Sequence, residues 1–567
     1  MIFNLILIFI YPLIILVSTI GYGLIFKKFF FKNDYYLNIS ILGIFGLFSL
    51  YILSSITHLF VPHNIFHNSL VHFIGLLNFF FLKDLIKKKE IKLVFTFFII
   101  LFLGFIISKT NEDFPYYHLP MSLQIVEQKL QFGIGNINVA YNHFSSLFHI
   151  NSLFYLPLVK YYLFNLTNFL FQIFFFSGLF LILKDKKIPN FLVVLISLTL
   201  LIYILKFNRL AEYGADLPGQ LLAIMSIIFC YIAYFGQDQI NKKNLFFLLE
   251  ISFYLIIFAT TTKILYAMYI IIPLSISLKI FKINDLLKYF LKLRFLFISF
   301  LSLTTLIFYN FALSGCLVYP ISSTCFYETF SWTLEKETID HMKTHYNAWS
   351  KGVIGAGFGV SDTEKYLSNF YWIKNWFNKY FFTKVSDFIL LNILIFLIYF
   401  FSFKKDIIGK INQNNKKNSF FILQVPIIFV LLVWFFNFPT LRYAGYSIVF
   451  LFLALPFCFY ISSKIDVSKD IFLKKFQVLF IIALIVFNFK NVLRINNELN
   501  LELNQHHNFS NFPFYWINQI NYKKVKSGKI VYNLVEGPYC WSTPSVCITA
   551  EGLTVKKVNN YLIHYKK

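Results

Sequence analysis

The sequence predicts an all-α polytopic integral membrane protein with about 14 transmembrane helices, extracytoplasmic loops and a small C-terminal tail domain of β or α/β type. Three observations lead to this fold class. Hydrophobic residues make up 58% of the 567 residues, charged residues only 14%, and the mean hydropathy is +0.66. A soluble domain typically carries about 25% charged residues, so this chain has too few charges to cover its apolar surface in water. The other two observations are apolar runs of helix length and lysines that gather in alternate loops.

The apolar runs set the expected spans. Crossing a bilayer takes about 20 apolar residues, and about 14 runs are long enough or nearly so. The first run is too long for a cleaved signal peptide and lacks a small-residue cleavage site, so we expect a retained helix that begins outside. The runs are 3–26, 37–60, 69–82, 93–107, 161–183, 191–205, 217–236, 245–262, 264–278, 295–313, 386–403, 420–437, 445–461 and 476–488.

Basic residues gather in alternate loops between these runs. Basic loops stay on the cytoplasmic side, and about 14 spans put every basic cluster there. The net charge of +25 is therefore a topology signal. A nucleic-acid surface would need one contiguous basic face, so we expect the lipid bilayer as a partner and no nucleic acid. The clusters lie at 27–32, 83–92, 184–187, 242–243, 279–294, 404–417 and 464–475.

A membrane domain and a polar tail are expected. The tail holds a run from Lys529 to Val535 that predicts a β-strand, followed by the turn sequence Glu536-Gly537-Pro538. Nucleotide-binding loops and the zinc-protease motif do not occur in the sequence. The expected boundaries are 1–488 for the multi-pass domain, with outer loops at 108–160 and 314–385, and 489–567 for the tail.

The cysteines agree with this topology. Cys316 and Cys325 fall in one outer loop, and Cys540 and Cys547 fall in the tail. Cysteines close in sequence on the oxidising side of a membrane predict disulfides, and their spacings do not match those of zinc ligands. The two remaining cysteines lie within apolar runs, where they are expected to be small buried hydrophobic residues: Cys230 and Cys458.

The first candidate for chemistry is an acidic pair, Glu112 and Asp113, in the sequence NEDFPYYHLP at 111–120. It directly follows an apolar run, and two tyrosines and His118 crowd it. Apolar surroundings raise the pKa of a carboxylate, which suits a general base. The alternative is a helix end with solvated acids and interfacial tyrosines.

Two cations are candidates for holding an anion. Lys263 lies between two apolar runs, where an ionisable residue is a functional candidate by default. Arg442, in the sequence FPTLRYAGY at 438–446, offers a guanidinium that matches phosphate geometry. For both residues the alternative is a long side chain that reaches to the membrane interface.

A further loop carries two more acids, Glu212 and Asp216, four residues apart. On a helix they would share a face, although Gly214 is positioned to break such a helix. With Asp113 they are candidate oxygen ligands of a divalent cation. The alternative is a solvated loop with a surface pair between Arg209 and Glu212, and the sequence leaves the cofactor undecided.

The loop 314–385 is rich in tryptophan and tyrosine. Such rings stack on sugars, but they also anchor membrane interfaces, and we expect interface anchoring for most of them. They include Trp332, Tyr346, Trp349, Tyr366, Tyr371, Trp372 and Trp376.

An acidic pair just outside a span, followed by a long loop before the next spans, resembles the GT-C superfamily of membrane glycosyltransferases. The Arg-Tyr element at 442–443 is similar to one that begins a late helix in that superfamily. The sequence SGCLVYP at 314–320 resembles its Gly-x-x-x-Tyr-Pro loop. The segment from Cys540 to Cys547 resembles a poorly characterised bacterial branch of such proteins. In typical members one span precedes the acidic loop, whereas here about three more spans precede it.

The resemblance implies a GT-C-like fold and transfer of a sugar from a polyprenyl-phosphate donor to a glycan or lipid acceptor on the extracytoplasmic face of a bacterial cytoplasmic membrane. Asp113 would be the catalytic carboxylate with Glu112 beside it, and Arg442 and Lys263 would bind the donor phosphate. Secondary or acceptor-side candidates are His118, Glu212 and Asp216. Three alternatives remain: a transporter or flippase for lipid-linked glycans, a polymerase of them, and a non-catalytic membrane protein.

Overall fold

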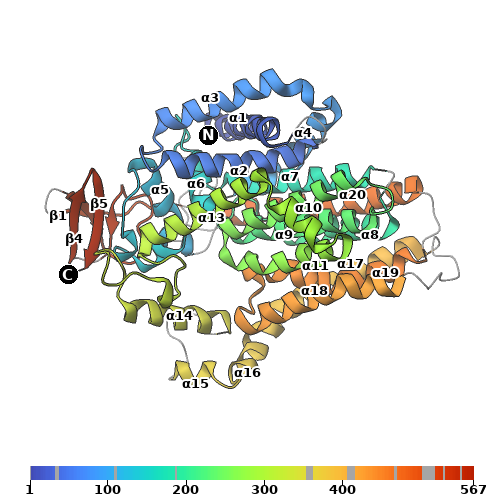
Figure 1. The fold of residues 1–567 in the computed structure, drawn as a ribbon. Helices are drawn as coiled ribbons and strands as arrows, with labels where there is room; N and C mark the ends of the chain where they lie inside the picture. The colour runs from blue at the N-terminus through green and yellow to red at the C-terminus, as the bar shows by residue number, and fades with distance from the viewer. Residues whose placement is uncertain are drawn as a thin grey trace.

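A computed structural model describes most of the chain and is predominantly helical, with two small sheets at the C-terminus (Figure 1). The described residues are 2–31, 37–107, 112–185, 188–352, 360, 362–404, 416–464, 469–500, 517–527, 530–549 and 552–566. Asn111, Lys529 and parts of the basic clusters at 27–32, 184–187, 404–417 and 464–475 therefore lie outside the described residues.

Each apolar run coincides with a helix. The long helices are α1 (Ile2–Phe30), α2 (Ile39–Thr57), α3 (Ile65–Leu82), α4 (Lys88–Ile106), α7 (Leu166–Leu183), α8 (Asn190–Lys206), α9 (Asp216–Phe235), α10 (Lys242–Thr262), α13 (Leu293–Ser314), α17 (Ser386–Phe403), α18 (Lys416–Asn437), α19 (Tyr446–Ser462) and α20 (Lys469–Asn500). The 3-10 turn η6 (Ile264–Ile270) continues into α11 (Ile271–Ile280) to complete the set.

Among the described residues, 11 helices are long and apolar enough to cross a membrane. The chain is thus a multi-pass membrane protein, as predicted. The remaining runs are helical but fall short: α8 and the η6–α11 segment are shorter apolar helices, and α4 begins with charged residues. A total of about 14 spans stays a prediction. The last helix continues to Asn500, past residue 488, where the membrane domain was expected to end.

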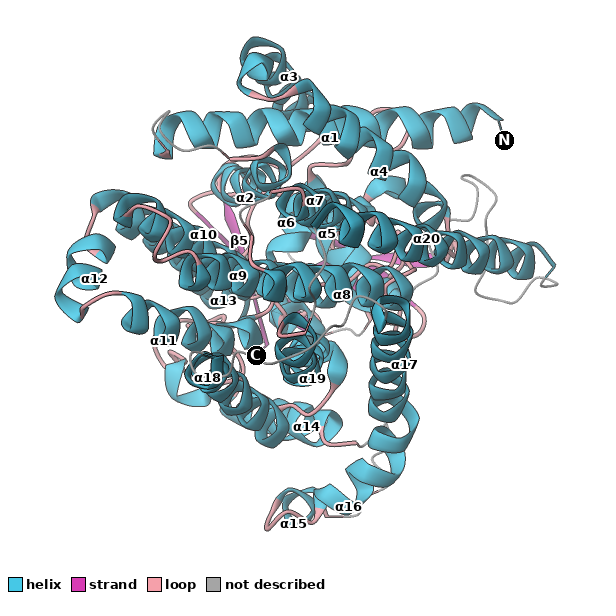
Figure 2. Cartoon of the chain, turned by 90° about the vertical axis from the view of Figure 1, so that its right-hand side faces the viewer, coloured by secondary structure: helices cyan, strands magenta, loops and turns pink. Residues whose placement is uncertain are grey.

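Helix α1 crosses α2 and α3 at a steep angle and is packed between them. Figure 1 looks nearly along α1, whereas α2 and α3 run across that view, and Figure 2 shows α1 lengthwise. Glycines permit this contact. A Cβ on Gly21 would lie 1.9 Å from the Gly75 carbonyl oxygen, and one on Gly46 would lie 1.8 Å from that of Thr19. Small residues let membrane helices approach until their backbones touch.

One end of the bundle carries the elaborate loops and the strands (left in Figure 1). Backbone bonds join segments far apart in sequence there: the Leu130 N–H donates to the His58 oxygen at 2.9 Å, and the Leu210 N–H to the Gly104 oxygen at 3.1 Å. The short helices of this end are α5 (Leu119–Glu127), α6 (Ser146–Ser152), α14 (Lys336–Ser350), α15 (Thr363–Leu367) and α16 (Trp372–Trp376). The short helix α12 (Ile283–Phe290) joins α11 to α13.

One sequence expectation for the outer loops is wrong. Helix α5 packs within the protein, with its residues 119–123 and 125–126 buried. Four of the seven aromatic residues, most of which were expected at the membrane interface, are buried in the protein interior: Trp332, Tyr366, Trp372 and Trp376. Their burial depends on contacts with distant segments, which aromatic composition does not reveal.

The tail forms the expected small β structure. Strand β2 (Ile530–Val535) pairs antiparallel with β1 (Tyr522–Ser527) and parallel with β3 (Cys547–Ile548), while β4 (Leu553–Val558) and β5 (Tyr561–Lys566) form a hairpin. Gly537, in the predicted turn, has a φ of +97°, which glycine adopts at little cost. Phe132 bridges to Ile563 of β5, so the tail is docked on the loop after α5.

Candidate functional site

Asp113 begins a π-helical turn, η2 (Phe114–His118), that follows α4 and leads into α5. Phe114 is fully buried and anchors the turn. The Asp113 side chain remains 33% exposed, so it is both fixed and accessible. Glu112 is exposed and lies beside Tyr539 of the tail, whose hydroxyl has its pKa raised by burial and by this carboxylate.

Arg442 lies in a kinked turn, η10 (Leu441–Gly445), between α18 and α19, and the backbone of Tyr443 and Ala444 within it is not helical. Ala444 has a φ of +63° there, a conformation that alanine rarely adopts, and the Tyr269 hydroxyl donates to its carbonyl oxygen at 2.5 Å. Other side chains bind the backbone around it. Trp376 Nε1 donates to the Pro439 oxygen (2.7 Å), Trp434 Nε1 to the Thr440 oxygen (3.1 Å), Gln220 Nε2 to the Leu441 oxygen (3.1 Å), and the Leu441 N–H to the Tyr380 hydroxyl (2.8 Å).

Four charged residues from four separate segments meet in what we call the charged cluster: Asp113, Asp216, Lys263 and Arg442. Arg442 lies 3.2 Å from Asp113 through Nη2 and 3.2 Å from Asp216 through Nε, and Lys263 Nζ lies 2.7 Å from Asp216. The side chains are 26% to 40% exposed. Asp216 is the first residue of α9, where the helix dipole favours a negative charge.

Aromatic rings enclose the charged cluster. The Tyr443 ring lies 4.0 Å from Lys263 Nζ and 5.4 Å from the Arg442 guanidinium carbon, and such cation–π contacts restrict both cations. Burial raises the pKa of the Tyr117 hydroxyl, and the Asp113 carboxylate raises it further. The His118 ring stacks on Tyr213 with centroids 5.3 Å apart.

His118 is neutral at physiological pH. Burial lowers its pKa to about 4, and the acids of the charged cluster only partly oppose this. Its Nδ1 is buried and has no hydrogen-bond partner among the described residues. The ring therefore packs close to the charged cluster without a direct bond to it.

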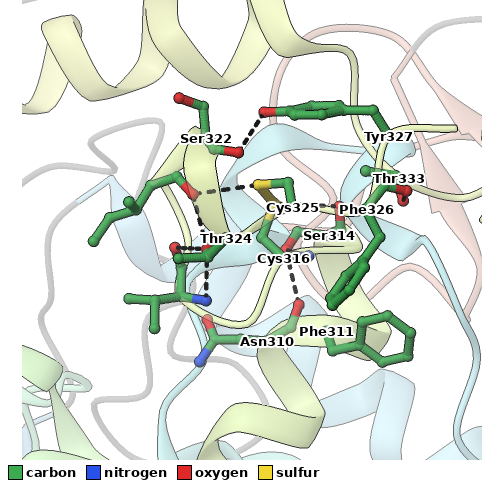
Figure 3. Close-up of a disulfide and its surroundings, with 12 residues drawn as sticks. Asn310, Phe311, Ser314, Cys316, Ser322, Thr324, Cys325, Phe326, Tyr327 and Thr333 are labelled. Carbon is green, nitrogen blue, oxygen red and sulfur yellow. Dashed lines mark hydrogen bonds between the residues drawn. A yellow bond between two sulfur atoms is a disulfide. The ribbon is translucent and has the colours of Figure 1, made fainter. Parts of the chain in front are cut away.

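The loop 314–385 lies at the same end of the molecule, where its tyrosines pack against His143. The His143 ring lies 4.8 Å from Tyr346, 5.8 Å from Tyr117 and 6.1 Å from Tyr319, measured between centroids. The predicted disulfide Cys316–Cys325 is formed and folds the start of this loop back on itself (Figure 3). It fixes the segment from which Tyr319 projects.

The tail contacts the acidic turn directly. Its second disulfide, Cys540–Cys547, is also formed. Inside that small loop the Trp541 N–H donates to the Pro115 carbonyl oxygen at 3.1 Å. The Ser545 N–H donates to Glu127 Oε2 at 2.5 Å, and its hydroxyl donates to Gln124. The tail thus forms one wall beside the acidic pair.

Glu212 lies outside the charged cluster. The helix begins only at Asp216, after Gly214, so the two acids do not share a helix face. Glu212 instead pairs with Arg209 at 3.1 Å, and both side chains are about half exposed. Within the described ranges no group of three His, Cys, Asp or Glu residues is placed to hold a metal ion, and Arg442 already occupies both acids of the charged cluster.

The sequence indicated the charged residues and the tyrosines beside the acids, but not the rest of their surroundings. Tyr117 and Tyr443 lie against the charged cluster, and Gln220, Tyr269 and Trp376 hold the turn that carries Arg442. Tyr117 follows Asp113 by four residues and Tyr443 directly follows Arg442, so closeness in sequence was the signal for these two. The other three lie far from Arg442 in sequence, and nothing local marks them.

The arrangement is suited to binding an anion. Two cations are held side by side by one shared acid, Asp216, and a second acid, Asp113, contacts Nη2 of the guanidinium. A phosphate would take the place of Asp113 on the Arg442 guanidinium, and the charge balance of the cluster would change little. The Asp113 carboxylate would then lie beside the bound phosphate.

Residues 5–450 match a family described as Domain of unknown function (DUF8201), a match that covers most of the chain. No curated protein and no solved structure matches the chain.

Proposed function

The chain belongs to the DUF8201 family, and from the geometry of its site we propose that it is a membrane glycosyltransferase of GT-C type. It moves a sugar from a polyprenyl-phosphate donor to a cell-envelope acceptor, a glycan or a lipid. The observation that carries the proposal is the charged cluster. An acid, a shared acid and two cations converge at the loop-rich end of a helix bundle, where a lipid-borne phosphate is within reach of the bilayer surface.

Arg442 and Lys263 bind the donor phosphate in this proposal. A guanidinium offers two parallel N–H groups to phosphate oxygens, and the ammonium of Lys263 adds a second positive charge. Asp216 is a positioning residue, because it bonds both cations. The hydrogen bonds that surround the Arg442 turn fix it before the donor arrives, so little reorganisation is needed on binding.

The chemical step is an inverting displacement. An acceptor hydroxyl oxygen attacks the anomeric carbon and forms the new glycosidic bond. The bond between that carbon and the phosphate oxygen breaks, and its electron pair leaves with the polyprenyl phosphate. Asp113 accepts the hydroxyl proton as general base, while Arg442 and Lys263 stabilise the charge that develops on the phosphate.

Asp113 is bonded to Arg442 in the free protein, and this contact has a consequence for the reaction. A donor phosphate competes for the same N–H groups, so its binding would replace the Arg442–Asp113 bond as it places the sugar. The donor therefore binds before the acceptor hydroxyl is deprotonated.

The site faces the extracytoplasmic side of the bacterial cytoplasmic membrane in this proposal. Both disulfides lie in segments that reach the end of the charged cluster, and disulfides persist on the oxidising side. The basic loops alternate in sequence with the loops of this end, and basic loops favour the cytoplasm.

The test compares cells that carry the wild type, Asp113→Asn, Arg442→Ala and the matched control Glu212→Gln, all at equal membrane levels. The control removes Glu212, an acid at the same end of the molecule, which forms an exposed ion pair with Arg209. Lipid-linked sugars and envelope glycans are profiled by mass spectrometry. We expect both cluster variants to accumulate an unused lipid-linked sugar and to lose one glycan residue, while the control matches the wild type.

Two outcomes count against the transferase. If both cluster variants match the wild type while a deletion does not, the charged cluster is structural. If purified protein moves an intact lipid-linked glycan across a vesicle membrane and Asp113→Asn preserves this movement, the chain is a transporter. Loss of chain length with normal repeat units would indicate polymerisation.

A further inference from the structure

The strand region of the tail, described at 517–527, 530–549 and 552–566, is strongly basic, and the proposed reaction uses none of this charge. Its six described lysines are all exposed, against a single described acidic residue, Glu536, which lies 3.9 Å from Lys523. Basic residues are normally depleted from short translocated segments, so their concentration here calls for a separate reason. We call the group the tail lysine surface: Lys523, Lys524, Lys526, Lys556, Lys557 and Lys566.

The two sheets are joined, which brings the lysine-bearing strands together. The Ser527 hydroxyl at the end of β1 donates to the Leu553 oxygen at the start of β4, at 3.1 Å. Leu553 is paired with Lys566 across the hairpin, and Lys526 precedes Ser527. Lys526 of β1 and Lys566 of β5 are therefore close together although 40 residues separate them in the sequence.

The strands that carry these lysines are set apart from the helix bundle. The strands lie beyond the ends of the helices, at the far end of the molecule (Figure 1), whereas lipid headgroups are level with helix ends. The tail is also clamped to the acidic turn by the Trp541–Pro115 and Ser545–Glu127 bonds. A chain bound along the strands would thus be held close to the site but out of the bilayer.

We propose that the tail lysine surface binds an anionic polysaccharide, a chain with repeated carboxylates or phosphates. Lysines are strongly hydrated point charges on flexible stems, which suits spaced charges on a polymer better than one fixed anion. The strands carry no arginine that would select a single phosphate. The identification of this polysaccharide as the acceptor rests on the proposed transferase function. The binding of the polysaccharide to the tail does not.

Binding is measured with full-length protein in nanodiscs of zwitterionic lipid. The probe is fluorescent polygalacturonate, with neutral dextran as the control polymer, at low and moderate salt. The test variant is Lys524→Gln/Lys526→Gln/Lys557→Gln. The matched control removes three exposed lysines at the start of α4, Lys88→Gln/Lys89→Gln/Lys92→Gln.

We expect polygalacturonate to bind, dextran not to bind, and added salt to weaken binding, because exposed charges are screened. The tail variant should lose at least tenfold in affinity and the control variant less than twofold. Since the substituted side chains are exposed, equal melting temperatures check the fold.

Three results would overturn the proposal: no polygalacturonate binding, equal losses in both variants, or an unaffected tail variant. If the tail variant instead loses only binding to vesicles of anionic phospholipid, the surface faces lipid and the polymer assignment is wrong. The binding assay does not depend on sugar transfer, so a negative result does not count against the transferase. The glycan profile of Asp113→Asn cells tests the transferase separately.

Discussion

Asp216 is the hub of the charged cluster, and its neutralisation gives the sharpest test of the site's geometry. Asp216→Asn keeps the side-chain shape but leaves Lys263 and Arg442 without their shared acid. At an effective dielectric of 20, the gross attractions at 2.7 Å and 3.2 Å are roughly 6 and 5 kcal/mol. Desolvation offsets most of this. Exposed pairs contribute about 0–1 kcal/mol, and breaking a buried pair costs about 3–5 kcal/mol.

The Asp216 side chain is 30% exposed, so its two pairs lie between these limits, and we expect Asp216→Asn to lose about 2–3 kcal/mol of unfolding free energy. Denaturant titration of purified protein in mixed micelles measures this. Glu212→Gln is the matched control, because its pair with Arg209 is exposed and should contribute below about 1 kcal/mol.

A double-mutant cycle tests whether the contact is direct. Arg442→Ala alone removes one partner of Asp216, so the double variant Asp216→Asn/Arg442→Ala should lose less than the sum of the single losses. The reasoning is refuted if Asp216→Asn matches Glu212→Gln, or if the two cluster substitutions are additive within about 0.5 kcal/mol. Either result would mean that the cations are held by other groups.

Three further outcomes are expected. Cys540→Ser/Cys547→Ser opens a short loop and should cost roughly 2–3 kcal/mol by the loop-entropy estimate, together with faster proteolysis of the tail. Gly46→Leu places side-chain atoms where a backbone oxygen already lies, so folded protein should fall sharply in membranes, whereas Gly214→Ala, which meets nothing within 4 Å, should accumulate normally. His118 is neutral when folded, with its pKa lowered to about 4, so its stabilising effect is complete above its usual pKa near 6.5 and is lost as pH falls towards 4. Its replacement by Phe should therefore reduce the stability lost between pH 7.5 and pH 5 by about 2 kcal/mol, and an unchanged pH dependence would contradict the burial of this ring.

Local sequence determined the helices, the multi-pass character and the tail strand. Each follows from the composition of a short segment, because burying apolar surface in lipid demands runs of fixed length. The disulfides were predictable for a similar reason, since Cys316 and Cys325, like the tail pair, are close in sequence. Sequence also indicated Asp113 and Arg442 as unusual charges at the ends of spans.

Tertiary structure decided which of these charges belong together. Asp113 and Arg442 are 329 residues apart, and Asp216 and Lys263 are 47 apart, so no local pattern could pair them or leave out Glu212. The same holds for Trp376. Its place in an aromatic-rich loop suggested a membrane anchor, but its side chain lies in the interior and holds the turn that carries Arg442. Helix formation is a property of neighbours along the chain, whereas an ion pair depends on how whole helices pack, and packing is decided by all their contacts at once.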